Sequence, residues 1–481
     1  MNILASFATT LAVCVGVINA QALPESDYPS YPPRNFTQKL NHDLPNDETT
    51  FQQLYQLDTS HFKPGGPILF HQSEESAMTP IEGNIFSEYA PKVNGILAGL
   101  EHRFFGTSFP PGSTYDNITT EAYGPLTLEN VLQDSVEFVD WVRSTVPGAE
   151  NSPVIYTGGS YGGFLAVMAR IRHPETFYGS LSISPLLRSW GAGATLAENP
   201  YKFAATDWLA QVYYDLSAEA AWKIRNAVQE LDNCVKASNC DTMIPGLSLC
   251  TQPASAGAWN SLLWDGIVEQ YAQIAQFSMG VKNLYAANAL QQLINATLAA
   301  STTAEVLRAP LAIKLGLLDA DYKSEICLNW TQIATSGGSI TGQAWDYISC
   351  TYVVATESSV SPSNPLFPAH QTASPVTGCS HPEWEGPMYS WTNEQTVAYY
   401  GISDEQLDRV ERLLIVHGDQ DRTTAIGMPE LSFRADRNHS RVIVVPGLAH
   451  GESIMPERYE PRGIKTQLDL VRFIVLAYRH S

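Results

Sequence analysis

Ser160 lies at the centre of a G-x-S-x-G motif, residues 158–162, that could supply a catalytic nucleophile. The apolar run 154–157 precedes the motif, and a helical pattern opens after it at Phe164. A serine on a tight strand-to-helix turn exposes its hydroxyl, and the backbone N–H of the next residue, Tyr161, then faces a bound carbonyl oxygen. Glycines flank the serine because side chains there would clash with the strand and the helix. The pattern therefore favours a nucleophile elbow, with Tyr161 as oxyanion donor, over a structural glycine-rich turn.

A serine nucleophile needs a base, and the base needs a carboxylate that orients it. Behind a nucleophile elbow the order along the chain is serine, acid, histidine. The apolar strand 413–416 leads into Asp419 and Asp421. A second apolar strand, 441–445, is followed by His450. We predict that His450 is the base and Asp421 the acid, with Asp419 as the alternative, because these loops follow strand ends at the ligand-binding rim of a parallel sheet.

His417 is a second histidine near this rim, but it directly follows its strand. It lies too close to that strand to reach over Ser160, so we predict a packed loop histidine. Asp419 or Asp421 could also be a solvated loop acid, although the pairing with His450 at the expected place argues against that.

Four segments carry a family resemblance. Residues 101–106 read E-H-R-F-F-G and residues 158–163 read G-G-S-Y-G-G, while Gly418-x-x-Asp421 and Gly447-x-x-His450 form the acid and histidine loops. Weaker matches lie at Trp345, at Cys350 and at residues 327–329. Together they resemble the S28 serine peptidases, a family of prolyl carboxypeptidases, dipeptidyl peptidases and prolyl endopeptidases, from about residue 36 to the C-terminus.

The resemblance implies an α/β-hydrolase core, a cap over its rim, and cleavage of small peptides after proline without a cofactor or a metal. Two departures stand out. Arg422-Thr423 replaces the family's Pro-Trp after the acid, and residues 71–76 read H-Q-S-E-E-S where relatives carry a glycine-rich G-x-E-G. The loop 71–76 should supply a second oxyanion N–H, so the loss of glycine could reshape that site. Ile348 also stands where relatives often have glutamine.

The N-terminal segment and the cysteines indicate a secretory route. Residues 1–22 form an apolar, uncharged run that ends in A-Q-A, which predicts a signal peptide rather than a membrane anchor. Cys14 would leave with it, and the even set that remains suits three disulfides in an oxidising compartment. These cysteines are Cys234, Cys240, Cys250, Cys327, Cys350 and Cys379. The predicted N-glycosylation sites are Asn35, Asn117, Asn295, Asn329 and Asn438.

The formal net charge of −21 and the pI near 4.9 indicate an acidic protein. Such a surface repels nucleic acid and anionic membranes, so we expect neither as a partner once the signal is removed. We expect a monomer or homodimer that is secreted, vacuolar or lysosomal. Function in an acidic compartment and a need for solubility at neutral pH explain the negative net charge about equally well.

The pattern of apolar residues divides the mature chain into a core interrupted by an insertion. Residues 23–195 and 406–481 show strand–helix rhythm, which predicts the two parts of an α/β-hydrolase core. Residues 196–405 lose that rhythm, contain helical segments and hold every mature cysteine, which predicts a mainly helical, disulfide-rich cap. The predicted core strands are 67–70, 93–100, 154–157 and 180–184, and the predicted helices include 127–146, 218–231, 286–300 and 464–478.

Two further sets of residues have open roles. Glu101 and Arg103 could form an active-site ion pair or a structural brace. Trp345, Trp384 and Trp391 could pack on a proline ring, although cap core is the more ordinary role. The sequence as a whole predicts a serine peptidase that acts on peptides through Ser160, His450 and Asp421. The alternatives are a carboxylesterase with the same triad and a non-catalytic hydrolase-fold binding protein.

Overall fold

The computed structural model describes most of the chain between residues 32 and 456. The described ranges are 32–114, 118–188, 190, 199–240, 244–278, 288–317, 327–331, 342–354, 359–370, 381–428 and 439–456. Several predictions fall outside these ranges: the signal peptide 1–22, the helix 464–478, the sequons Asn117 and Asn438, and Cys379. Within the described ranges, no helix is both long and apolar enough to cross a membrane.

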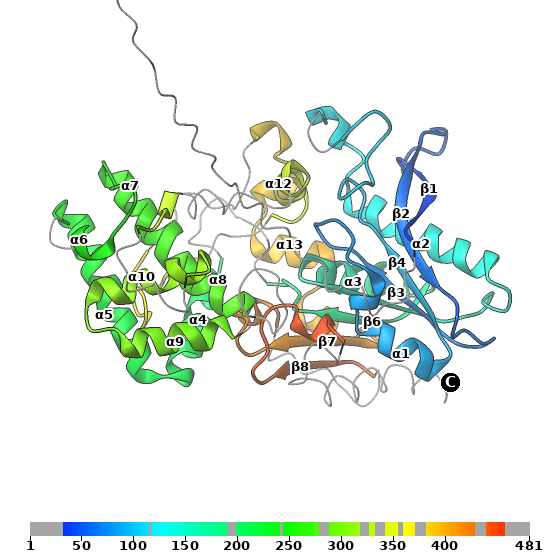
Figure 1. Cartoon of the computed structure of the whole chain (residues 1–481). Coiled ribbons are helices and arrows are strands. Elements are labelled where there is room, and N and C mark those ends of the chain that lie inside the picture. The colour runs from blue at the N-terminus through cyan, green and yellow to red at the C-terminus, as the bar shows by residue number, and fades with distance from the viewer. Residues whose placement is uncertain are drawn as a thin grey trace, which may run out of the picture.

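A sheet of eight strands, ordered β1-β2-β4-β3-β5-β6-β7-β8, forms the centre of the core (Figure 1). The strands are β1 Arg34–Lys39, β2 Thr50–Asp58, β3 Ile68–Gln72, β4 Ile96–Leu100, β5 Val154–Gly159, β6 Phe177–Ile183, β7 Leu413–Gly418 and β8 Arg441–Val445. Strand β2 pairs antiparallel with β1 and β4, and all pairings from β4 to β8 are parallel. This order and these directions are those of the predicted α/β-hydrolase core.

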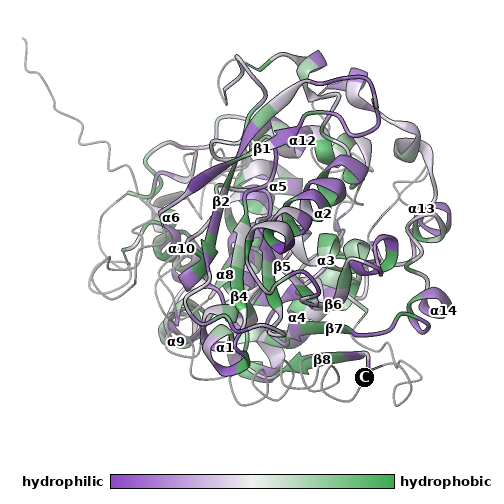
Figure 2. Ribbon diagram, turned by 90° about the vertical axis from the view of Figure 1, so that its right-hand side faces the viewer, coloured by the Kyte–Doolittle hydropathy of each residue, from purple (hydrophilic) through white to green (hydrophobic). Residues whose placement is uncertain are grey.

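Burial explains why the central strands read as apolar runs. Every residue of β3, β4, β5 and β7 is buried, as expected for parallel strands covered on both faces. Figure 2 shows this contrast, with hydrophobic colour on β4 to β7 and hydrophilic colour on the edge strand β1. The carboxyl ends of β5, β6 and β7 meet at one rim, from which the loops with Ser160 and Asp421 emerge.

Helices α1 (Phe86–Val93), α2 (Leu128–Thr145) and α3 (Tyr161–Arg172) belong to the core. Thr127 caps α2 by accepting a hydrogen bond from the Asn130 N–H, so the helix predicted from residue 127 begins where its cap predicts. The predicted strand 93–100 was too long, because residues up to Val93 belong to α1 and β4 begins only at Ile96.

The cap helices gather on one side of the sheet (green in Figure 1) and enclose a hydrophobic cluster of their own. They are α4 Ala204–Leu216, α5 Ala218–Ala237, α6 Ile244–Leu247, α7 Ala256–Ser261, the π-helical η5 Leu262–Val268, α8 Glu269–Phe277, α9 Ala289–Ala299 and α10 Thr303–Lys314. Disulfides join Cys234 to Cys240 and Cys250 to Cys327, and Cys350 is also disulfide-bonded. Cystine cross-links within the predicted cap are therefore confirmed.

The C-terminal part of the predicted cap packs differently. Its helices are α12 Gly342–Thr351, α13 Asn393–Tyr400 and α14 Asp404–Leu407. Ile348, Tyr400 and Leu407 join the hydrophobic cluster of the core, whereas Leu209, Leu263 and Leu293 of the earlier helices form the cap cluster. Residues 342–354 and 384–407 therefore pack against the core and not against the helices of the cap cluster. The cap boundaries at residues 196 and 405 remain a prediction.

The remaining short turns of helix are η2 Ile81–Gly83, η3 Thr120–Tyr123, η6 Pro382–Trp384, η7 Pro387–Ser390, η8 Arg422–Ile426 and η10 Glu452–Ile454. Two of them border the rim, since η8 follows Asp421 and η10 follows the loop that carries His450.

Candidate active site

Ser160 occupies a strained turn between β5 and α3. Its backbone angles are φ 54° and ψ −119°, a conformation that residues other than glycine rarely adopt. A side chain at Gly158 would lie 2.4 Å from the carbonyl oxygen of Gly162, and one at Gly163 would lie 2.5 Å from that of Ile183. Close backbone approach therefore requires glycine at Gly158 and Gly163, whereas a side chain at Gly159 or Gly162 would meet its neighbours only at ordinary contact distance.

The backbone N–H of Tyr161 lies at the candidate site, while its side chain is buried. Its N–H is the first of helix α3, and the N–H groups of a first helical turn lack acceptors within the helix. The positive end of the helix dipole favours negative charge at this point. The phenol hydroxyl lies 3.2 Å from His102 Nε2 and 2.9 Å from the Tyr352 hydroxyl. Burial raises the pKa of Tyr161 well above its usual value, so the phenol stays neutral and anchors the turn.

His450 and Asp421 lie in contact at the rim. The Nδ1 atom of His450 is 2.7 Å from Oδ2 of Asp421, and both side chains are almost fully buried. The Thr423 N–H and hydroxyl donate to Asp421 Oδ1 at 2.8 and 2.7 Å, and the hydroxyl also lies 3.0 Å from His450 Nδ1. Burial alone would raise the pKa of Asp421, but the charge of His450 and these hydrogen bonds lower it below its usual value. The carboxylate therefore stays ionised in mildly acidic solution.

The alternative residues have other contacts. Asp419 Oδ1 accepts the Gly447 N–H at 2.7 Å, which ties the acid loop to the histidine loop. His417 is buried in β7 with Nε2 2.8 Å from the carbonyl oxygen of Gly427. Burial lowers the pKa of His417 to about 4, so this histidine is neutral and packed, as its position in the sequence indicates.

The histidine loop lies against the strands that flank Ser160. The Gly451 N–H donates to the Ser184 hydroxyl, just past β6, at 3.0 Å. A side chain at Gly159, the last residue of β5, would meet Ile454 at 3.6 Å. The fold thus brings the loops of Ser160, Asp421 and His450 to the same rim, although nearly 300 residues separate the first from the last.

A family model described as serine carboxypeptidase S28 matches residues 38–467. The chain belongs to this family. It is 30% identical to lysosomal Pro-X carboxypeptidase of Homo sapiens over 336 residues, and 28% identical to the Mus musculus protein over 334 residues. Each alignment covers 66% of this chain and 64% of the relative, slightly less than two thirds of the relatives' own length.

Solved structures offer more distant likenesses. A proline iminopeptidase from Mycobacterium smegmatis covers 92% of this chain and 100% of its own, with 12% sequence identity and a TM-score of 0.39. The S28 resemblance that the E-H-R-F-F-G and G-G-S-Y-G-G segments indicated is confirmed by the family model, which matches residues 38–467.

The loop after β3 sets Glu74 beside the elbow, with Glu75 next to it in the chain. A side chain at Gly162 would lie 3.4 Å from Cβ and Oε2 of Glu74. Burial and the charge of Glu75 raise the pKa of Glu74 to about 8. Burial also raises the pKa of Glu75, against the opposing effects of its own N–H and the charge of His450. The sequence revealed the loss of glycine but not these shifted carboxyl groups.

His71 does not neutralise Glu74. Its Nε2 atom lies 3.9 Å from Glu74 Oε2, and burial lowers the pKa of His71 to about 4. Burial thus favours the uncharged form of both groups, and the 3.9 Å separation is longer than a hydrogen bond. Among the described residues, the Oε2 atoms of Glu74 and Glu75 have no hydrogen-bond partner.

Glu101 and Arg103 take separate partners instead of forming a pair. Glu101 accepts hydrogen bonds from the Thr107 N–H at 2.9 Å and the Ser108 hydroxyl at 2.6 Å. Arg103 is fully buried and donates to both carboxylate oxygens of Asp134 at 2.6 Å. The expected Glu101–Arg103 pair is therefore wrong, and each residue braces the core separately.

The three tryptophans proposed for proline contact pack against other aromatic rings. Their ring centroids lie 5.3 Å from Tyr161 for Trp345, 5.6 Å from Tyr123 for Trp384, and 5.3 Å from Tyr399 for Trp391. All three join the hydrophobic cluster of the core. These contacts support the structural role for the three rings.

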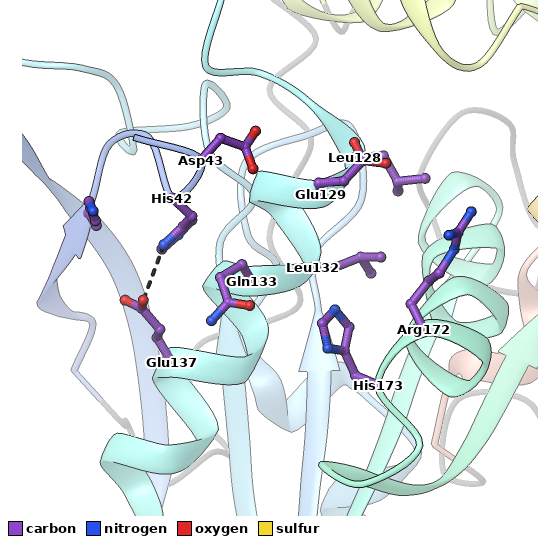
Figure 3. A pocket seen from close by; sticks show the side chains of 10 residues that line it. His42, Asp43, Leu128, Glu129, Leu132, Gln133, Glu137, Arg172 and His173 are labelled. Atoms are coloured by element: carbon purple, nitrogen blue, oxygen red, sulfur yellow. Dashed lines mark ion pairs between the residues drawn. The ribbon is translucent and has the colours of Figure 1, made fainter. Parts of the chain in front are cut away.

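A separate cavity of about 400 Å³ lies beside α2 and the end of α3, and Ser160, Asp421 and His450 are not among the residues that line it (Figure 3). His42 faces Glu137 at 3.1 Å there and also lies 2.7 Å from Asp134. Burial lowers the pKa of His42, but the hydrogen bonds and charges of these two carboxylates outweigh it and raise the pKa overall. The charged groups that line this cavity around His42 are therefore paired with one another. Within the described ranges, no group of three or more His, Cys, Asp or Glu side chains could hold a metal ion.

Proposed function

We propose that the protein is a secreted, vacuolar or lysosomal serine peptidase that hydrolyses the peptide bond after proline. Membership of the S28 family supports a peptidase, and the human relative is named for a Pro-X carboxypeptidase activity. The observation that carries the assignment of residues is the 2.7 Å contact between His450 Nδ1 and Asp421, on the rim that bears the strained Ser160.

In this proposal Ser160 Oγ attacks the carbonyl carbon of the scissile bond while His450 Nε2 accepts its proton. Asp421 keeps its negative charge and orients His450 by accepting a hydrogen bond from the Nδ1–H group. His450 then gives its proton to the leaving amine, and an ester forms between Ser160 and the acyl part of the peptide. Water, deprotonated by His450, hydrolyses that ester and restores the serine.

The oxyanion of each tetrahedral intermediate needs two donors, and the Tyr161 N–H is the first. The second should come from the loop after β3. On that loop the Ser73 N–H already donates to the carbonyl oxygen of Leu100 at 3.0 Å, and the Ser76 N–H donates to the carbonyl oxygen of Glu74 at 2.8 Å. We propose the backbone N–H of Glu74 or Glu75 as the second donor, and this N–H would then exchange its interaction with the residue's own carboxyl group for the oxyanion.

The exposed sequons accord with a secretory route. Asn35, Asn295 and Asn329 are exposed, so a glycan could reach each of them. The lysosomal location in the relatives' names and the disulfides support the same compartment class.

The test is product analysis of a mixed peptide library by mass spectrometry at pH 4–7. We expect cuts after proline, and their position relative to the peptide ends will distinguish the carboxypeptidase, dipeptidyl peptidase and endopeptidase modes. The Ser160→Ala protein is the matched control and should leave the library intact. Turnover of simple esters without any peptide cleavage would favour the carboxylesterase, and no turnover of either would favour a binding protein.

A further inference from the structure

The last turn of cap helix α8 contacts His450, the proposed base. The backbone N–H of His450 donates to the carbonyl oxygen of Gln276 at 2.8 Å. The ring of Phe277 lies 5.5 Å from the imidazole and nearly perpendicular to it, at 86°. The position of His450 therefore depends on where the cap places the end of this helix.

Arg422 connects that helix to the acid loop. Its Nε donates to Gln276 Oε1 at 2.7 Å, and its two terminal nitrogens donate to the Glu269 carboxylate at 2.9 and 3.2 Å. Glu269 and Gln276 stand two helical turns apart and so lie on one face of α8. Because Arg422 directly follows Asp421, one planar guanidinium joins the acid loop to both ends of the helix that carries the histidine contact.

We propose that Arg422 is a positioning residue for His450. By bonding to α8, Arg422 holds this cap helix against the acid loop, so the position of the cap affects the geometry of Ser160, His450 and Asp421. The inference rests on the proposed function, since it concerns how the proposed base is held.

The contacts predict an effect on rate more than on stability. The Arg422 and Glu269 side chains are 18% and 39% exposed, and ion pairs with such access to water contribute little to folding stability. The cap also contacts the acid loop independently, through Trp208 Nε1 and the carbonyl oxygen of Asp419 at 2.9 Å. In contrast, a displacement of about 1 Å in a catalytic group can cost about 100-fold in rate.

The experiment measures the second-order rate at which a fluorophosphonate labels Ser160, together with kcat and KM on a proline-containing peptide. The variants are Arg422→Ala, Glu269→Ala and their double variant. Arg422→Lys retains the charge but loses the planar fork, and Arg409→Ala removes an exposed ion pair with Glu405 as the matched control.

Arg422→Ala should lower the labelling rate and kcat about tenfold or more, with KM within about threefold of wild type. The double variant should be no slower than Arg422→Ala, because both substitutions break one link. Arg422→Lys should recover part of the rate, and Arg409→Ala should behave as wild type. Melting temperatures should stay within a few degrees across the set.

An unchanged labelling rate in Arg422→Ala would overturn the inference, as would additive losses in the double variant. A lower melting temperature with unchanged kcat would show a purely structural brace and would overturn it too. A wild-type protein that neither takes the label nor cleaves peptide would instead refute the proposed function, so the two failures can be told apart.

Discussion

The loop after β7 and the loop after β3 shift the pKa values of their carboxyl groups in opposite directions. Asp421, on the loop after β7, is surrounded by donors, and its pKa is lowered. Glu74, on the loop after β3, has a buried Oε2 without a hydrogen-bond partner among the described residues, and its pKa is raised to about 8. One loop is organised around a permanent charge, and the other holds a group that changes charge near neutrality. The pH response of the site should therefore come from both loops in different ranges.

The largest effects should follow from removing the nucleophile or the base. Ser160→Ala or His450→Ala should each lower kcat by several orders of magnitude, because neither group acts without the other. Steady-state kinetics and circular dichroism should show lost turnover with an intact fold. A Ser160→Ala protein with wild-type turnover would show that the elbow is not the nucleophile.

The two carboxylates of the acid loop should differ sharply. Asp421→Asn should lower kcat by about 10³–10⁴, because the amide no longer orients His450 in the required tautomer. Asp419→Asn should cost far less, since the Asp419 carboxyl group bonds to backbone N–H groups of the loops, such as that of Gly447, and Asp421 is the residue paired with His450. If Asp419→Asn were the crippling change in steady-state assays, the assignment of the acid would be wrong.

Thr423 should have an intermediate effect. Its hydroxyl donates to ionised Asp421, so Thr423→Val should raise the pKa of that carboxyl and move the acid limb of kcat/KM to higher pH. Thr423→Ser keeps the hydroxyl and should retain the wild-type profile. Identical pH profiles for the valine and serine variants would show that the hydroxyl does not support the acid.

The smallest effect should be on stability, at Glu74. A carboxyl whose folded pKa is raised to about 8 binds its proton more tightly in the folded state, so its contribution to stability is greatest below the unfolded pKa of about 4.5 and declines up to about pH 8. Glu74→Gln should therefore raise the melting temperature at pH 8 and leave it nearly unchanged at pH 4. Calorimetry that shows an equal shift at both values would contradict the raised pKa.

The elbow could be predicted from the sequence because its causes are local. A buried strand, a strained turn and a helix follow one another within residues 154–172, and close backbone contacts require glycine at Gly158 and Gly163. The loops of Asp421 and His450 could be placed by the same logic of strand ends. The start of β4 was misplaced, because Val93 is the last residue of helix α1 and Asn94 caps that helix in the left-handed conformation.

Contacts between distant segments could not be predicted. Gln276 and Phe277 lie more than 170 residues before His450 in the chain, and no local pattern marks their approach. The Arg103–Asp134 pair replaced the expected Glu101–Arg103 pair for the same reason. The state of Glu74 depends on burial by segments far away in sequence, which residue type alone does not reveal.

The most direct test of the central claim is to locate the adduct of a fluorophosphonate probe by peptide mass spectrometry. The account predicts a single adduct on Ser160 in the wild-type protein, and no adduct within the same time in His450→Ala, because only a serine activated by its histidine reacts quickly. No labelling of the wild-type protein, or an adduct on another serine, would contradict the assignment of Ser160 and His450.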